Sequence, residues 1–133
     1  AATFIAYSES IRREHDIPPK LLELMILRVG HRCSAPYEVH HHKRLARQAG
    51  LSDAEIDATA TGPQAAGLDD AQRFVLTLVD ELVDARTLSQ PNFDAAVAAY
   101  GIRTVADMVL LVGFYTMACM FLNSFAVDIE PPA

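Results

Sequence analysis

Glu38 and His42 stand four residues apart, in a stretch of the chain that is rich in ionisable side chains. Successive residues of an α-helix turn by ~100°, so positions i and i+4 project from the same side of the helix. Leu45 and Ala49 share this side, which is therefore the apolar side that should face the core. Because a carboxylate and an imidazole are seldom buried without a partner or a function, the pair predicts acid–base chemistry.

Glu23 is expected to complete a cluster with this pair, because it is the only acidic residue in the apolar segment 20–30. If segments 20–30 and 36–49 fold back on each other as antiparallel helices, the rise of ~1.5 Å per residue brings Glu23 level with Glu38 and His42. Burial and mutual repulsion raise the pKa of carboxylic acids, whereas a nearby imidazolium lowers it. We therefore expect the three groups to share a proton near neutral pH and to titrate together. The alternative is a buried Glu–His pair that only fixes the register of the two helices.

Two residues beside the pair are candidates for contact with a substrate. Tyr37 borders the apolar side of the same predicted helix, and its hydroxyl group could donate a hydrogen bond to a ligand or seal the start of the helix. His41 lies at the edge of that side and could line the mouth of a pocket. Phe114 and Tyr115, on a long apolar segment near the C-terminus, are expected in the core rather than in a pocket.

Three consecutive histidines, residues 40–42, invite comparison with a metal site. Neighbouring residues on a helix diverge by ~100°, however, so adjacent histidines cannot converge on one ion. Glu38, His42 and Glu23 could together supply three ligands, but proton transfer is the interpretation that we favour for this cluster. We expect neither a metal nor another cofactor, and we expect His40 to lie in solvent.

Helix signals dominate the rest of the chain, and no alternation of apolar and polar residues typical of strands persists. The sequence predicts an all-α, single-domain helical bundle of about seven helices over residues 1–133. Helices are expected over residues 4–14, 20–30, 36–49, a segment that begins after Ser52, 70–84, 89–100 and a long apolar segment that includes 108–127.

Capping residues indicate where several of these helices start. Ser34 is the expected N-cap of the helix that carries the Glu–His pair. Ser52 and Glu55 have the spacing of a capping box, in which each side chain bonds the backbone N–H of the other residue. Thr104 and Asp107 have a similar spacing and predict a helix start at that point.

The charge balance of the chain argues against nucleic acid as a partner. Lys and Arg number 11 against 17 Asp and Glu, which gives a net charge of −6 and leaves no basic stripe. The two cysteines form no Cys-x-x-Cys motif, and the N-terminal residues do not resemble a signal peptide. These features predict a cytoplasmic protein.

The high apolar content predicts a homo-oligomer. Hydrophobic residues make up 51% of the chain and the mean hydropathy is +0.15, which is more apolar than a monomer of this size requires. Segment 108–127 carries no formal charge and is long enough to cross a bilayer. It contains Asn123 and Ser124, and Asp128 and Glu130 follow it where basic residues would flank a span, so we favour a buried helix of a soluble oligomer and expect no membrane partner.

Cys33 stands close to the cluster in sequence, in the expected connector between two helices. A cysteine that reduces peroxides needs a lowered pKa and a second, resolving thiol, and we expect no such thiol near Cys33. We favour a structural role for Cys33 and a core position for Cys119. Peroxide or disulfide chemistry through Cys33 stays open as an alternative.

The chain resembles a known family at these same positions. The run LELMILR at 22–28, the Tyr37-Glu38 pair with His42, and the motif AGLS at 49–52 are similar to the carboxymuconolactone decarboxylase family, which is related to the alkyl hydroperoxidase D proteins. Segment 111–124 resembles the closing helix of that family. The resemblance implies an alkyl hydroperoxidase D-like helical fold that assembles as trimers or hexamers, with active sites near the contacts between subunits.

The resemblance also implies roles for individual residues. In the hydroperoxidase branch, a glutamate precedes a Cys-x-x-Cys pair and a histidine, and these two proton-handling groups fall on Glu23 and His42 of this chain. The two cysteine positions fall on Ala35 and Glu38. The resemblance therefore implies that the chain keeps the proton-handling groups and lacks both thiols.

We favour an enzyme of the decarboxylase type that uses no redox cofactor and acts on a small carboxylated lactone or a related product of aromatic-compound breakdown. His42 would deliver or remove a proton, and Glu38 or Glu23 would adjust the pKa of its imidazole. Tyr37 or His41 would orient the small-molecule substrate.

The acidic balance of the chain offers no general attraction for an anionic substrate, so Arg28 or an arginine of a neighbouring subunit is expected to supply it. Two alternatives belong to other classes of protein. One is an alkyl hydroperoxidase-like antioxidant enzyme of the peroxiredoxin type that acts through a cysteine. The other is a non-catalytic oligomer that holds small apolar ligands.

Overall fold

The computed structural model describes residues 2–125, and this part of the chain contains helices and no strand. The helices are α1 (Ala2–Arg13), α2 (Pro19–Arg32), α3 (Pro36–Gln48), α4 (Asp53–Thr61), α5 (Asp70–Ala85), α6 (Gln90–Tyr100) and α7 (Ile102–Ser124). The predicted all-α bundle is therefore confirmed for the described residues.

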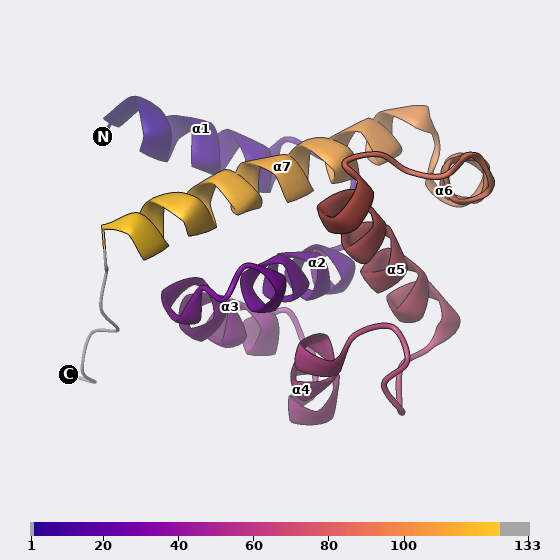
Figure 1. The fold of residues 1–133 in the computed structure, drawn as a ribbon, viewed down its shortest axis with the longest axis horizontal. Coiled ribbons are helices and arrows are strands. Elements are labelled where there is room, and N and C mark those ends of the chain that lie inside the picture. The colour runs from indigo at the N-terminus through magenta and orange to yellow at the C-terminus, as the bar shows by residue number, and fades with distance from the viewer. Residues whose placement is uncertain (1, 126–133) are drawn as a thin grey trace.

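Helix α2 lies at the centre of the bundle and packs against α3, α4, α5 and α7 (Figure 1). Every residue from 21 to 30 is buried, because this segment is apolar on nearly all sides. Glu23 and Arg28 are the only charged residues within it. Since a buried charge is costly unless it is paired, both side chains need partners inside the protein.

Helices α2 and α3 form the expected antiparallel hairpin. Gly30 of α2 faces Val39 of α3 near the connector, and a Cβ atom at position 30 would lie only 2.8 Å from Cγ2 of Val39. The missing side chain lets the two helices approach closely at this end. The connector is tight, since the backbone N–H of Ala35 donates to the carbonyl oxygen of Gly30 at 2.9 Å and Ser34 adopts a φ of 50°.

The predicted cap at Ser34 is wrong. Ala35 is the N-cap residue of α3, and no side chain caps this helix. The left-handed backbone of Ser34 makes it part of the turn before the helix. Pro36 starts α3 instead, because its ring presets a helical φ and it has no N–H to satisfy.

The capping box at Ser52 and Glu55 is confirmed, with both of its hydrogen bonds present at the start of α4. The predicted start at Thr104 is wrong, because α7 begins at Ile102. Gly101 has a φ of 85° and is both the C-cap residue of α6 and the N-cap residue of α7. Glycine adopts this conformation without strain, so the chain turns there and Thr104 is buried inside the helix.

Helix α7 runs across the top of the hairpin with α1 beside it (Figure 1). By length and composition, α7 is the one helix in residues 2–125 that could cross a membrane, with a mean hydropathy of 2.0 over an 18-residue window of which 44% is buried. Core helices of soluble proteins pass the same test. Seven large apolar side chains are exposed on α7 or just after it: Ile102, Val109, Leu110, Met117, Met120, Phe121 and Phe125.

Candidate active site

The structure brings Glu23, Glu38 and His42 together inside the hairpin. Nδ1 of His42 lies 2.7 Å from Oε2 of Glu23, and Nε2 of His42 lies 2.9 Å from Oε1 of Glu38. The side chains of His42, Glu23 and Glu38 are 3%, 6% and 8% exposed, respectively. The imidazole ring is thus held between two buried carboxyl groups, one from each helix.

Helical spacing and the hairpin together produce this arrangement. Glu38 and His42 lie one turn apart on α3, on the side that faces α2. Glu23 reaches His42 from α2. The two helices run antiparallel with Gly30 opposite Val39 near the connector, and this register places Glu23 opposite His42.

The two contacts of the ring require an extra proton in the cluster. A neutral imidazole has one N–H group, so it can donate to one carboxylate and not to two. The ring is therefore an imidazolium, or one of the two carboxyl groups is protonated. Burial by itself lowers the pKa of His42, but hydrogen bonds and charge interactions with Glu23 and Glu38 outweigh it and raise the pKa above its usual value.

A cavity of about 210 Å³ adjoins this cluster on the side of Glu38. Tyr37, Glu38, His41 and His42 line it from α3, and the rest of its wall comes from α1 and α7: Ser8, Phe114, Tyr115, Ala118, Phe121 and Leu122. Glu23 is not among the lining residues, so it lies behind the imidazole as seen from the cavity. Glu38 and His42 therefore face the cavity directly, whereas Glu23 contacts the imidazole from the other ring nitrogen.

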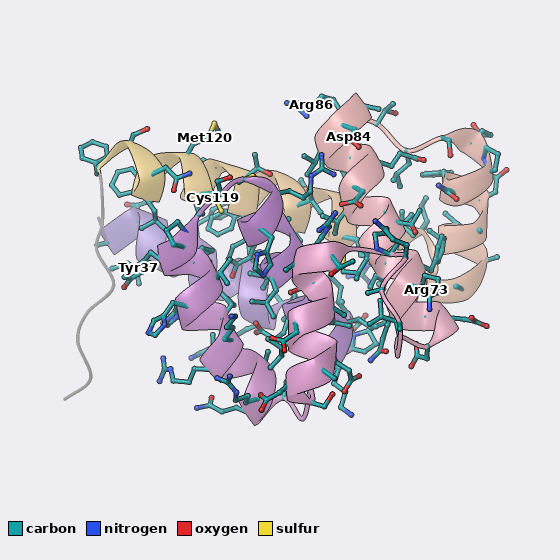
Figure 2. All side chains as sticks on the ribbon, turned by 60° about the horizontal axis from the view of Figure 1, so that its bottom comes forward. Tyr37, Arg73, Asp84, Arg86, Cys119 and Met120 are labelled. Atoms are coloured by element: carbon teal, nitrogen blue, oxygen red, sulfur yellow. The ribbon has the colours of Figure 1, made fainter. Side chains whose placement is uncertain are left out.

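Tyr37 and His41 both line the cavity, the position expected of substrate-contacting residues, and their rings stack with centroids 6.5 Å apart. Tyr37 lies in the first turn of α3 and is labelled in Figure 2. Phe114 and Tyr115 are buried, as predicted, but they also form part of the cavity wall. The ring of Tyr115 packs edge-on against His42 at a centroid distance of 5.3 Å and covers the imidazole from the side of α7.

Arg28 does not serve the cavity, which corrects the expectation that it attracts an anionic substrate. Its guanidinium makes two hydrogen bonds with the carboxylate of Asp80, at 2.7 and 3.0 Å. It also donates to the carbonyl oxygens of Thr59 and Ala60, at 3.0 and 3.1 Å. A buried guanidinium needs partners for its donors, and those available to Arg28 lie on α4 and α5, away from α3 and α7.

His40 is exposed, as predicted. Among residues 2–125, no group of three or more His, Cys, Asp or Glu side chains is arranged to hold a metal ion. In the cluster, the two nitrogen atoms of His42 contact carboxylate oxygens instead of pointing with them toward a shared centre.

The expectation that Cys33 has no thiol close to it is wrong. Cys119 of α7 is buried, as predicted, and it is close enough to Cys33 for the two thiols to interact, which helps to raise the pKa of Cys119. No pattern in the sequence signals this contact, because it depends on how α7 crosses the connector between α2 and α3.

The helical fold and the buried Glu–His–Glu cluster define a small all-α protein with a charged cluster inside its core. The chain belongs to the carboxymuconolactone decarboxylase family, whose match covers residues 1–81. The predicted family resemblance is thus confirmed. No curated protein matches the chain significantly.

The same fold occurs in a solved structure. The structure is similar to the crystal structure of an uncharacterized peroxidase-related protein from Silicibacter sp. TM1040, with a TM-score of 0.84 over 99% of this chain and 70% of that one. The two sequences are 19% identical. This likeness concerns the fold alone.

Proposed function

We propose that the protein is a cofactor-independent acid–base enzyme of the decarboxylase type. Its substrate is a small carboxylated lactone or a related product of aromatic-compound breakdown. The observation that carries this proposal is the buried imidazole of His42, which lies between Glu23 and Glu38 and next to a cavity of about 210 Å³. Membership of the carboxymuconolactone decarboxylase family supports the reaction class.

In this proposal Glu38 exchanges the proton with the substrate. Both ring nitrogens of His42 are engaged by carboxyl groups, and of these two groups only Glu38 lines the cavity. His42 then restores the proton of Glu38, and Glu23 holds the imidazole in place and keeps it basic. A carboxyl group that faces the cavity, with an imidazole bonded to it from inside the protein, is positioned for general acid catalysis.

The chemical step needs one proton and no electron carrier. When the carbon–carbon bond to the carboxylate breaks, CO₂ leaves and its bonding electrons stay on the ring carbon, where an adjacent unsaturated carbonyl group delocalises them. Glu38 protonates the carbon, and solvent later returns a proton to the cluster through the cavity. Tyr37 and His41 orient the substrate, since they line the cavity next to Glu38.

The reaction is tested by running it in D₂O on a panel of carboxylated lactones, with the corresponding lactones that lack the carboxylate as controls. We expect release of CO₂ and a single deuterium at the carbon that carried the carboxylate. Binding of these lactones without turnover of any of them would instead favour the non-catalytic ligand-binding protein.

We also propose that the protein is a cytoplasmic homo-oligomer. The outward side of α7 exposes Leu110, Met117 and Met120, and Phe121 is both exposed and part of the cavity wall. A second copy that covers this side would remove apolar surface from water and would close the cavity near Phe121. The family resemblance implies trimers or hexamers.

A further inference from the structure

We propose that Cys33 and Cys119 form a redox-active dithiol, which a low-molecular-weight disulfide converts into an intramolecular disulfide. The two cysteines come from distant parts of the chain and meet where α7 crosses the connector between α2 and α3. Neither belongs to the Glu–His–Glu cluster. This proposal does not depend on the function proposed for that cluster.

The proximity of the two thiols follows from the packing of α7 on the connector. The side-chain amide of Asn123 donates to the carbonyl oxygen of Cys33 at 3.0 Å and fixes the last turns of α7 against the connector. Cys119 lies one helical turn before Asn123, so it projects from the same side of α7. Figure 2 shows Cys119 on the side of α7 that faces the α2–α3 hairpin, with Met120 on the opposite side.

The two thiols differ in access to solvent. Cys33 is partly exposed and lines a cavity of about 430 Å³, together with residues of α5 and α7 that include Val83, Gly113 and Thr116. Cys119 is 0% exposed. A small reagent in this cavity can therefore reach Cys33, whereas Cys119 is closed to solvent and has Cys33 as a neighbour.

The electrostatic environment assigns the second step to Cys119. Burial, together with the neighbouring Cys33 and Glu38, raises the pKa of the Cys119 thiol to about 12. Cys119 is therefore a thiol at neutral pH, and a thiol is far less nucleophilic than a thiolate. Cys33 reacts first, and Cys119 reacts only with the sulfur that is already in contact with it.

The reaction balances without any further reactant. The thiolate of Cys33 attacks one sulfur of the small disulfide, the bond between its two sulfurs breaks, and one small thiolate leaves and takes up the proton that Cys33 lost. The sulfur of Cys119 then attacks that of Cys33, the mixed disulfide breaks, and a second small thiol leaves with the proton of Cys119. Two protein thiols and one small disulfide become one protein disulfide and two small thiols.

The test is to equilibrate the reduced full-length chain in glutathione buffers of graded composition, quench it with acid and weigh it by intact mass spectrometry. We expect wild type to lose the mass of two hydrogen atoms, with a fraction oxidised that follows [GSH]²/[GSSG]. A mixed disulfide would add the mass of one glutathione and would follow [GSH]/[GSSG] instead. Both readouts are independent of catalytic turnover, so failure of this proposal and failure of the decarboxylase proposal are distinguishable.

Two variants separate the steps. In Cys119→Ala, Cys33 should stop at the mixed disulfide with glutathione. In Cys33→Ser, Cys119 should stay reduced, because the residue that forms the mixed disulfide beside it is missing. If a variant fails to fold, the dependence of the wild-type protein on the glutathione ratio decides alone.

Three results would overturn the proposal. One is wild type that accumulates the mixed disulfide as far as Cys119→Ala does. Another is wild type that keeps both thiols at every ratio. The third is oxidation that links two chains, seen as a dimer on a non-reducing gel.

Discussion

Nε2 of His42 lies 2.9 Å from Oε1 of Glu38, one turn earlier on the same helix. Because the other ring nitrogen is bonded to Glu23 at 2.7 Å, no ring nitrogen is left to face a ligand directly. In the proposed mechanism, a proton therefore moves between His42 and a molecule in the cavity through the carboxyl group of Glu38.

Loss of either member of this pair should abolish most of the proton transfer. We expect Glu38→Gln and His42→Ala each to lower kcat by about 10²–10⁴, the usual contribution of a positioned acid or base. The double variant should be little worse than either single one, because the two residues act as a unit. His40→Ala, an exposed histidine on the same helix, is the matched control and should keep full turnover. Full activity in both single variants would exclude the proposed mechanism.

Glu23 should set the titration of His42 from behind the ring. Hydrogen bonding and charge interaction with Glu23 help to raise the pKa of His42 against the effect of burial. We therefore expect Glu23→Gln to lower that pKa, as measured from the imidazole resonances by NMR over a pH series. An unchanged midpoint would mean that Glu23 does not act on the ring.

The same cluster should make stability depend on pH in a defined direction. Since the pKa of His42 is higher in the folded protein than in the unfolded chain, its stabilisation is fully present below about pH 6.5 and is lost as the pH rises through the raised pKa. The difference in unfolding free energy between wild type and His42→Gln should therefore shrink from pH 6 to alkaline pH in urea titrations. His40→Gln should show no such trend, and a difference that grows with pH would contradict the assignment.

Gly30 should be needed for the close approach of α2 and α3. A methyl group there would lie 2.8 Å from Cγ2 of Val39, so Gly30→Ala should destabilise the chain by about 1–3 kcal/mol through overpacking. Val39→Ala removes Cγ2, the atom that a methyl group at position 30 would clash with. The Gly30→Ala/Val39→Ala double variant should therefore be more stable than the sum of the two single effects predicts. Strict additivity of the two variants in urea unfolding would show that the helices do not touch there.

A charge on the outward side of α7 should break the proposed oligomer. Wild type should partition into the soluble fraction without detergent and show the mass of several subunits by light scattering. Met117→Asp should reduce that mass to one subunit, because Met117 is 43% exposed on α7 and would be covered by a second copy. Thr87→Glu, on an exposed loop, is the control and should leave the mass unchanged. Recovery of wild type only with detergent would favour a membrane partner for this side.

Features fixed by local spacing could be predicted from the sequence. The same-side placement of Glu38 and His42 follows from helical periodicity, and the capping box at Ser52 follows from a three-residue pattern. The position of Glu23 required one further assumption, that two neighbouring helices fold back across a short connector. That assumption involves no distant part of the chain, which is why it could be made.

Features fixed by tertiary packing could not be predicted in this way. The pairing of Arg28 with Asp80 depends on where α5 lies, and the contact of Cys33 with Cys119 depends on where α7 crosses the connector. The caps at Ser34 and Thr104 were wrong for a local reason, since Pro36 and Gly101 are stronger determinants of a helix start at these two points.

Helix α2 holds both Glu23 and the anchor Arg28 within one stretch that is buried from end to end. The outer wall of the cavity comes instead from α7 and α1. Substitutions in the buried part of α2 are therefore expected to lower both the stability of the fold and the proposed activity. Substitutions at Phe121 or Leu122 are expected to alter the shape of the cavity beside the cluster. If the proposed function is right, substitutions in α7 should change which substrate fits, while the Glu–His–Glu cluster between α2 and α3 stays intact.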